Sequence, residues 1–197
     1  MGRIYCIMGK SSSGKDSIYQ KVIEAGIPGL ERMIPYTTRP VRADETDGKQ
    51  YHFCDKRRMK ELEAAGRIIE LRTYETVYGA WDYFTVDDGQ LHLADTSYLY
   101  IITLEGYLKI RKHFGNERVV PIYIEVEDGE RLIRAIEREK QQKKPRYDEM
   151  CRRYLADAAD FSEEKLAEAA IRKRFVNSSM ANTIQEIITY ITDDMTR

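Results

Sequence analysis

The stretch Gly9-Lys10-Ser11-Ser12-Ser13-Gly14-Lys15 decides how this chain must fold. It has the spacing G-x-x-x-x-G-K of a Walker A phosphate loop. Glycines let successive backbone N–H groups turn toward phosphate oxygens, and the lysine can reach the terminal phosphates. The apolar run at 3–8 predicts a strand before the loop, and the apolar spacing within 17–24 predicts a helix after it. The motif therefore stands in the strand–loop–helix context that phosphate binding requires.

Strands and helices alternate along most of the chain. Residues 98–104 and 119–126 are apolar runs rich in β-formers, and helical patterns follow them at 105–114 and from Asp128. This alternation predicts an α/β fold, a three-layer sandwich of the P-loop NTPase type with a mainly parallel sheet. Further strands are predicted at 32–36, 51–53, 68–71, 76–85 and 171–177, and further helices at 55–66, 147–159 and 183–191.

Two segments interrupt the alternation. The segment 36–95 is rich in short strands and predicts a separate lobe, while the wholly polar stretch 139–146 breaks the helix that starts near Asp128. We expect a single domain over 1–197, with a core of 1–35, 96–138 and 154–197, an inserted lobe of 36–95 and a helical lid of 139–153.

Composition excludes several classes of protein. The 197 residues carry 32 Lys and Arg against 33 Asp and Glu, a net charge of −1 that gives no general attraction to nucleic acid or to an anionic membrane. No apolar run approaches the roughly 20 residues that span a bilayer. Cys6, Cys54 and Cys151 are widely spaced and fit neither a disulfide framework nor a zinc site. We expect a cytoplasmic protein without nucleic-acid or membrane partners, and self-association into a homo-oligomer stays open.

The residue after Lys15 departs from the motif. A Walker A loop continues with Ser or Thr, whose hydroxyl binds Mg²⁺, whereas here Asp16 stands at that place and Ser17 follows it. An acidic residue in the first turn also stabilises a helix, so Asp16 can be structural. An unpaired carboxylate would repel a triphosphate, which favours the interpretation of Asp16 as a metal ligand.

A second anion site is indicated further along the chain. The run Thr37-Thr38-Arg39-Pro40-Val41-Arg42 is followed by Glu45, by Asp47-Gly48 and by Tyr51. Two loop arginines three residues apart, with a tyrosine nine residues on, can bind a small phosphate monoester. At this point the chain resembles the guanylate kinase family, which has T-T-R-x-x-R and then E-x-x-G-x-x-Y after its phosphate loop.

Weaker matches extend the resemblance over essentially the whole chain. They are Gly66-Arg67-Ile68-Ile69-Glu70, Val77-Tyr78-Gly79, the arginine-containing helix after Asp128, and Phe175-Val176-Asn177. The resemblance implies transfer of the γ-phosphoryl group of ATP, with Mg²⁺, to a nucleoside monophosphate, GMP above all. It also implies an ATP site formed by Gly9, Lys10, Ser11, Ser12, Ser13, Gly14, Lys15, Asp16, Ser17 and Asn177.

The resemblance implies roles for residues outside the phosphate loop as well. The phosphate of the nucleoside monophosphate would be bound by Arg39, Arg42, Tyr51 and Tyr78. Glu70 would accept hydrogen bonds from N1–H and the 2-amino group of guanine. The catalytic groups would be Lys15 and the lid arginines Arg134, Arg138 and Arg153. A solvated basic helix face explains these three arginines equally well.

Some positions depart from the family pattern. Ile101 and Thr103 stand where the family has an Asp-x-Asp pair, and Ala80 replaces a hydroxyl residue that helps to recognise guanine. We expect Ala80 and Thr103 to lie at the base site, where a lost hydrogen-bond partner changes selectivity strongly. Two alternatives to a GMP kinase therefore stay open: a kinase for another nucleotide, and a catalytically inactive binding module.

Overall fold

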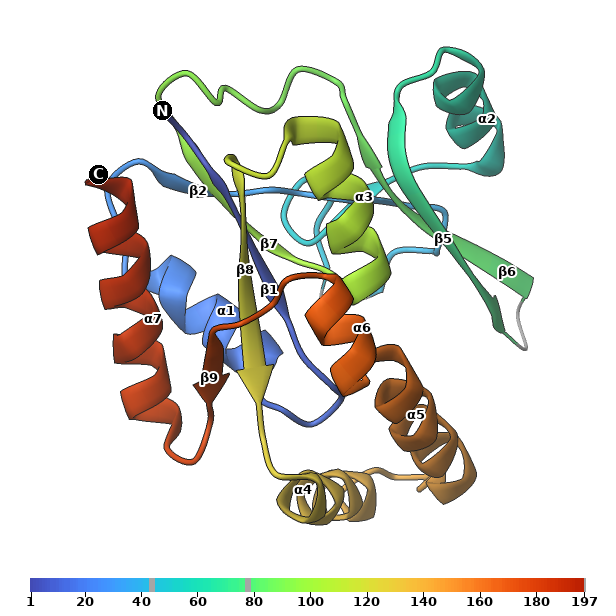
Figure 1. The fold of residues 1–197 in the computed structure, drawn as a ribbon. Helices are drawn as coiled ribbons and strands as arrows, with labels where there is room; N and C mark the ends of the chain where they lie inside the picture. The colour runs from blue at the N-terminus through green and yellow to red at the C-terminus, as the bar shows by residue number, and fades with distance from the viewer. Residues whose placement is uncertain (43–44, 77–78, 197) are drawn as a thin grey trace.

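A five-stranded parallel sheet forms the centre of the molecule (Figure 1). The computed structural model describes residues 1–42, 45–76 and 79–196. The strand order is β2-β7-β1-β8-β9. The strands are β1 (Ile4–Met8), β2 (Leu30–Arg32), β7 (Ser97–Ile101), β8 (Val119–Glu125) and β9 (Arg174–Val176). The predicted α/β class with a mainly parallel sheet is confirmed.

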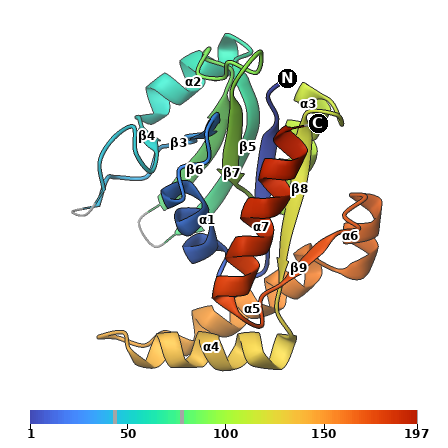
Figure 2. The ribbon, with the colours of Figure 1, turned by 90° about the vertical axis from the view of Figure 1, so that its left-hand side faces the viewer.

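The central strand β1 is buried on both faces. Its side chains alternate, so that Ile4, Cys6 and Met8 pack into one hydrophobic cluster while Tyr5 and Ile7 pack into another. Helices α1 (Lys15–Glu24) and α7 (Met180–Met195) cover the second cluster, and α3 (Leu104–Phe114) and α6 (Glu163–Glu168) cover the first (Figure 2). This double burial explains why the strand is a continuous apolar run. It gives the molecule three layers.

The lobe predicted between 36 and 95 contains a second sheet. Its strand order is β4-β3-β6-β5. The strands are β3 (Tyr36–Thr37), β4 (His52–Phe53), β5 (Ile68–Thr76) and β6 (Gly79–Val86). Helix α2 (Lys56–Ala64) covers this sheet with Met59 and Leu62, and Asp55 caps its first turn as expected. In Figure 1 the β5–β6 pair extends beyond α3, away from the central sheet.

The remaining helices lie past the carboxyl ends of the parallel strands. Helices α4 (Asp128–Lys140) and α5 (Tyr147–Asp160) pack against each other there, at the lower edge of Figure 1. The polar stretch between them ends α4 and begins α5, so the predicted interruption of the helix is confirmed. Ligands of α/β proteins bind at this end of the sheet. No helix among the described residues has the length and apolar character needed to cross a membrane.

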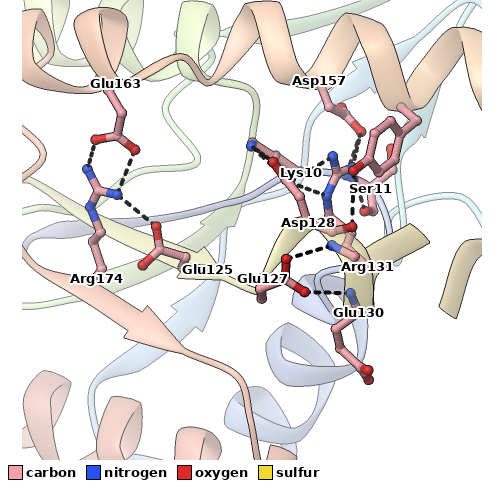
Figure 3. A network of polar contacts seen from close by, with 12 residues as sticks. Lys10, Ser11, Glu125, Glu127, Asp128, Glu130, Arg131, Asp157, Glu163 and Arg174 are labelled. Carbon is pink, nitrogen blue, oxygen red and sulfur yellow. Dashed lines mark hydrogen bonds and ion pairs between the residues drawn. The ribbon is translucent and has the colours of Figure 1, made fainter. Parts of the chain in front are cut away.

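The predicted elements differ from the structure at several places. The strand predicted at 32–36 is two strands, because the chain leaves the central sheet after Arg32 and Pro35 cannot donate a ladder hydrogen bond. The strand predicted at 171–177 is only Arg174–Val176. Helix α6 has no counterpart in the prediction, since six residues carry too little periodicity to be recognised. Arg174 ties this helix to the sheet through Glu163 and, at 2.7 Å, Glu125 (Figure 3).

Another difference concerns Thr103. The apolar run at 98–104 was predicted to be one strand, but β7 ends at Ile101 and Leu104 already belongs to α3. Thr103 is the N-cap of that helix, with its side chain accepting a hydrogen bond from the backbone N–H of Gly106 at 3.2 Å. A threonine at this position supports the helix start, a role that the expectation of a base contact did not include.

Thr103→Ala should lower the free energy of unfolding by about 0.5–2 kcal/mol, because the helix start loses its side-chain acceptor. Thr103→Ser keeps the hydroxyl and should stay close to the parent protein. Urea unfolding followed by circular dichroism measures both. Equal stability of the alanine variant and the parent would contradict the capping role.

Candidate functional site: a phosphate loop beside a large cleft

The phosphate loop connects β1 to α1 and is packed tightly against the C-terminal part of the chain. Gly14 adopts φ +84° as the N-cap of α1. A Cβ atom at Gly14 would lie 2.7 Å from Nδ2 of Asn177. That same nitrogen donates a hydrogen bond to the Ser13 carbonyl at 2.8 Å. Glycine is therefore required both by the backbone angle and by the close approach of Asn177.

The loop carries polar groups that lack partners. The hydroxyl oxygens of Ser12 and Ser13 are buried and have no hydrogen-bond partner among the described residues. Ser12 also has a left-handed backbone, at φ 64°. Unsatisfied buried hydroxyls and strained backbone cost free energy and gather at ligand sites. Together with the N-terminus of α1, which attracts anions, they fit the predicted phosphate-binding loop.

A buried arginine joins this loop to helices α4 and α5 (Figure 3). Arg131 on α4 is only 1% exposed, and its Nη1 donates to the Ser11 carbonyl at 3.3 Å and to Asp157 of α5 at 3.4 Å. Asp157 in turn accepts a 2.8 Å hydrogen bond from the backbone N–H of Ser11. The ring of Tyr154 lies 4.0 Å from the guanidinium carbon. Loop and helices therefore hold one another in place.

Asp128 completes this network at the start of α4. It accepts hydrogen bonds from Lys10 at 3.1 Å and from Arg131 at 3.2 Å. Although partial burial favours its protonated form, these two cations lower the pKa of Asp128 below its usual value. The sequence interpretation did not single out Arg131, Asp128 or Asp157. Their helices contain many charged residues, and the helical pattern alone does not show which of these become buried.

The three arginines expected in the lid lie in different surroundings. Arg134 pairs with Glu130 at 2.9 Å, and its Nη2 donates to the Asn177 carbonyl at 3.3 Å. Arg138 and Arg153 line a small hollow that also contains Ser11 and Ser12 of the phosphate loop. The structure thus brings all three arginines to the region of the phosphate loop.

A cleft of about 800 Å³ extends from the phosphate loop to the second sheet. Lys15 and Asp16 line one part of it, and Tyr51, Arg72 and Ile101 line another. Clefts of roughly 300–1,000 Å³ hold small-molecule ligands and cofactors. This cleft therefore has room for a nucleotide, with the phosphate loop on its border.

The expected binding group for a monophosphate is assembled around a buried ion pair. Arg39 is 3% exposed and donates to Glu45 at 2.6 Å, which lowers the pKa of that carboxyl. Glu45 also accepts from the backbone N–H of Arg42 at 2.9 Å, so it orders the loop between the two arginines. The Arg39 guanidinium lies 5.5 Å from the ring centre of Tyr51, and its Nε is buried without a hydrogen-bond partner among the described residues.

The other members of this group are placed differently. The Arg42 side chain is exposed on the same loop, and Tyr51 lines the cleft. Tyr78, which was expected beside them, lies outside the residues that the structure describes.

Glu70, expected to contact a base, is surrounded by other partners. Its side chain is 0% exposed and is held by Arg72, with Nε at 2.9 Å and Nη2 at 3.1 Å from the two carboxylate oxygens. Thr85 donates to it at 2.8 Å. Ala80 lies on β6, opposite Glu75 of β5. Of the Glu70–Arg72 pair, the arginine is the member that lines the cleft.

Asp16 is the acidic residue nearest the loop lysine. Its side chain is 81% exposed, and its carboxylate is 3.3 Å from Lys15 Nζ. No group of three or more His, Cys, Asp and Glu ligands occurs in the described part of the chain. Mg²⁺ in nucleotide sites needs only one or two carboxylates together with substrate phosphates. The exposed carboxylate beside the loop fits such a partial ligand set.

Known proteins resemble this chain in sequence and in fold. Residues 1–191 match the family model for guanylate kinase. The chain belongs to the guanylate kinase family. A guanylate kinase from Salinibacter ruber is 31% identical over 118 residues, which are 59% of this chain and 61% of that protein. One from Chromobacterium violaceum is 30% identical over 141 residues, 68% of this chain and 63% of that protein.

The curated relatives are therefore matched over about three fifths of their length. A solved structure of a guanylate kinase from Anaplasma phagocytophilum shares the fold. Its TM-score is 0.70 at 21% identity, with 100% of this chain and 87% of that chain covered. Membership of the guanylate kinase family, expected from the T-T-R-x-x-R block, is thus confirmed.

Arg131→Leu should destabilise the protein by about 2–4 kcal/mol, because Asp157 and the Ser11 carbonyl lose a buried cationic donor. Arg134→Leu on the same helix is the matched control and should cost about 1 kcal/mol or less, since its ion pair is partly exposed. Chemical denaturation of both variants gives the comparison. A similar loss of stability in Arg131→Leu and Arg134→Leu would mean that the buried network does not support the loop.

Proposed function

We propose that this protein transfers the γ-phosphoryl group of ATP to a nucleoside monophosphate, with GMP as acceptor and GDP and ADP as products. The observation that carries the proposal is the single cleft bordered by Lys15 of the phosphate loop and by Tyr51 of the Arg39–Glu45 group. Phosphoryl transfer needs two nucleotides aligned end to end and the charge on the transferred group neutralised. Lys15 of the phosphate loop, together with Arg39 and Arg42 on the loop whose Glu45 also lines the cleft, would meet both needs.

The donor nucleotide would be bound by the loop. Backbone N–H groups of the loop and Lys15 bind its phosphates, while Asn177 holds the loop against the C-terminal part of the chain. Arg138 and Arg153 stabilise the charge that spreads over the transferring group, and Arg134 supports them from the same side. The proposed donor site consists of Gly9, Lys10, Ser11, Ser12, Ser13, Gly14, Lys15, Asp16, Ser17 and Asn177.

The acceptor would be bound by the inserted lobe. Arg39, Arg42 and Tyr51 bind the monophosphate, and Glu45 orders the loop that carries both arginines. The Nε of Arg39, buried without a hydrogen-bond partner among the described residues, would donate to a phosphate oxygen. We assign the lobe to 36–95 and the lid to 139–153. Their approach over the core excludes water, which otherwise would hydrolyse ATP.

A divalent metal fits the same site. Asp16 would hold Mg²⁺ together with phosphate oxygens of the donor, in place of the usual loop hydroxyl. The chemistry supplied by such an ion would be neutralisation of negative charge on the donor phosphates. The chain's own contribution is the exposed Asp16 carboxylate and the neighbouring Lys15, which are placed at the first turn of α1.

One assay distinguishes a GMP kinase from the two alternatives, a kinase for another nucleotide and an inactive binding module. ADP release is measured with GMP, dGMP, AMP, UMP and CMP. A GMP kinase responds to GMP and dGMP, a kinase for another nucleotide responds to a different member of the set, and an inactive binding module responds to none. The loop lysine and the arginines beside it weigh against the inactive module, because protein binding alone requires neither.

Lys15→Ala should reduce phosphoryl transfer by about a thousandfold without unfolding the chain, because Lys15 pairs only with the exposed Asp16 among the described residues and supplies charge to the reacting phosphates. Lys21→Ala on the same helix is the control and should keep full activity, since Lys21 pairs with Glu24 at the surface. Steady-state ADP release measures both. Turnover that is unchanged in Lys15→Ala would remove the kinase proposal.

Asp16→Ser introduces the hydroxyl residue that a Walker A motif has at this position. The variant should nevertheless need a higher Mg²⁺ concentration for half-maximal rate, because a hydroxyl is a weaker ligand than a carboxylate. Adding Ile101→Asp or Thr103→Asp should then recover part of the loss, which a double-mutant cycle quantifies. Mg²⁺ titration at fixed ATP is the measurement. An unchanged metal requirement in Asp16→Ser would make Asp16 a structural helix-start residue.

A further inference from the structure

Arg72 is the charged group that the cleft presents on the side of β5. Its side chain is 14% exposed, whereas its partner Glu70 is 0% exposed. Arg72 lines the cleft and Glu70 does not. A ligand that enters between the two sheets therefore meets the guanidinium of Arg72 first, with the Glu70 carboxylate behind it.

The pairing leaves one edge of this guanidinium unused. Arginine has five N–H hydrogens. Nε and Nη2 each donate one of them to Glu70, at 2.9 and 3.1 Å. The other three hydrogens, on Nη1 and Nη2, have no partner within 1–42, 45–76 and 79–196. Nη1 and Nη2 together form the flat two-donor fork that binds a pair of adjacent acceptors.

Glu70 keeps this fork charged and in a fixed position. Burial opposes the charged form of Arg72, but the Glu70 carboxylate outweighs this, and the pKa of Arg72 is raised. Glu70 is itself fixed by a 2.8 Å hydrogen bond that it accepts from the Thr85 hydroxyl. The Thr85 hydroxyl oxygen also lies 2.7 Å from the hydroxyl oxygen of Tyr100. The fork is therefore preorganised by a chain of buried hydrogen bonds.

The Arg72 fork belongs to a cleft with a mixed lining. Ile101, at the end of β7, lines this cleft with an apolar side chain, and Glu149 lines it with an acceptor. The two Glu45 oxygens are engaged by Arg39 and by the Arg42 backbone. At Arg72 itself the cleft offers paired donors, whereas the N1–H and 2-amino edge of guanine requires acceptors.

We propose that Arg72 recognises the O6 and N7 edge of a 6-oxopurine monophosphate, and that the 2-amino group of guanine is not recognised. The inference rests on the proposed function and names the group that selects its acceptor. O6 and N7 of guanine are adjacent acceptors, and an arginine fork binds them with two parallel hydrogen bonds. Glu70 acts as a positioning residue that holds the fork and does not touch the base.

This arrangement has consequences for other purines. Inosine monophosphate keeps O6 and N7 and lacks only the 2-amino group, so it should be accepted as well as GMP. Adenosine monophosphate has an amino group in place of O6, which points donors at the donors of Arg72 and should be rejected. In 7-deaza-GMP a C–H group replaces N7, so that one of the two hydrogen bonds to Arg72 is lost.

The test uses the unmodified protein and four monophosphates: GMP, IMP, 7-deaza-GMP and AMP. Calorimetric binding and ADP release are measured for each. We expect IMP within about threefold of GMP, 7-deaza-GMP weaker by about 10- to 100-fold, and AMP weaker still. IMP weaker than GMP by more than about 30-fold, or 7-deaza-GMP equal to GMP, would overturn the assignment.

The two measurements separate this inference from the proposed function. The expected binding order without turnover of any monophosphate supports the role of Arg72 and overturns the kinase. Turnover of GMP with a strict requirement for its 2-amino group supports the kinase and overturns the role of Arg72. Binding of none of the four overturns both.

A variant pair tests the residue directly. Arg72→Ala would leave Glu70 buried without its cation, so Arg72→Lys is used, because it keeps the charge and removes the fork. In Arg72→Lys the preference for GMP over 7-deaza-GMP should fall to threefold or less. Arg58→Lys on α2, at the surface, should keep the parent preference. Full retention of that preference in Arg72→Lys would overturn the proposal.

Discussion

The arrangement of the site depends on one buried guanidinium, that of Arg131. It donates to the backbone of the phosphate loop and to Asp157 of α5, and it comes from the first turn of α4. A loop of glycines and serines has little side-chain packing of its own, so its conformation has to be held from outside. Arg131 and Asn177 do this from two sides, and both contact backbone atoms of the loop. Helices α4 and α5, which carry Arg134, Arg138 and Arg153, are thereby held against the loop.

In the lobe, two buried arginine–glutamate pairs likewise hold charged groups in place. Arg39 pairs with Glu45 and Arg72 pairs with Glu70, and in each pair the arginine keeps at least one N–H without a partner among the described residues. Removing one member of such a pair leaves a buried charge uncompensated. The carboxylates therefore keep the cations charged and oriented, while the remaining N–H groups stay available to a ligand. In our proposal one pair binds the phosphate of the acceptor and the other its base.

Much of the fold was predictable because its signals are local. The apolar run of β1, the spacing of the loop glycines and the Asp55 cap are properties of neighbouring residues, and the structure confirms the strand, the helix after the loop and the cap. The errors in the prediction fall where the local sequence pattern conflicts with the way in which the chain packs in three dimensions. Thr103 lay within a predicted strand but is the N-cap of α3, and the run at 32–36 divides because the chain passes from one sheet to the other. Helix α6 was too short for its pattern to be recognised.

The sequence by itself determined the phosphate loop, the α/β class and the family, because these depend on residue types at fixed spacing along the chain. The tertiary structure decided which charged residues face the ligand. Arg131 and Arg134 are three residues apart on one helix, yet the first is buried under the loop and the second pairs with Glu130 nearer the surface. Glu70 and Arg72 are two residues apart on one strand, yet only the arginine lines the cleft. Burial and pairing depend on the elements packed against each residue, and no spacing along the chain encodes those neighbours.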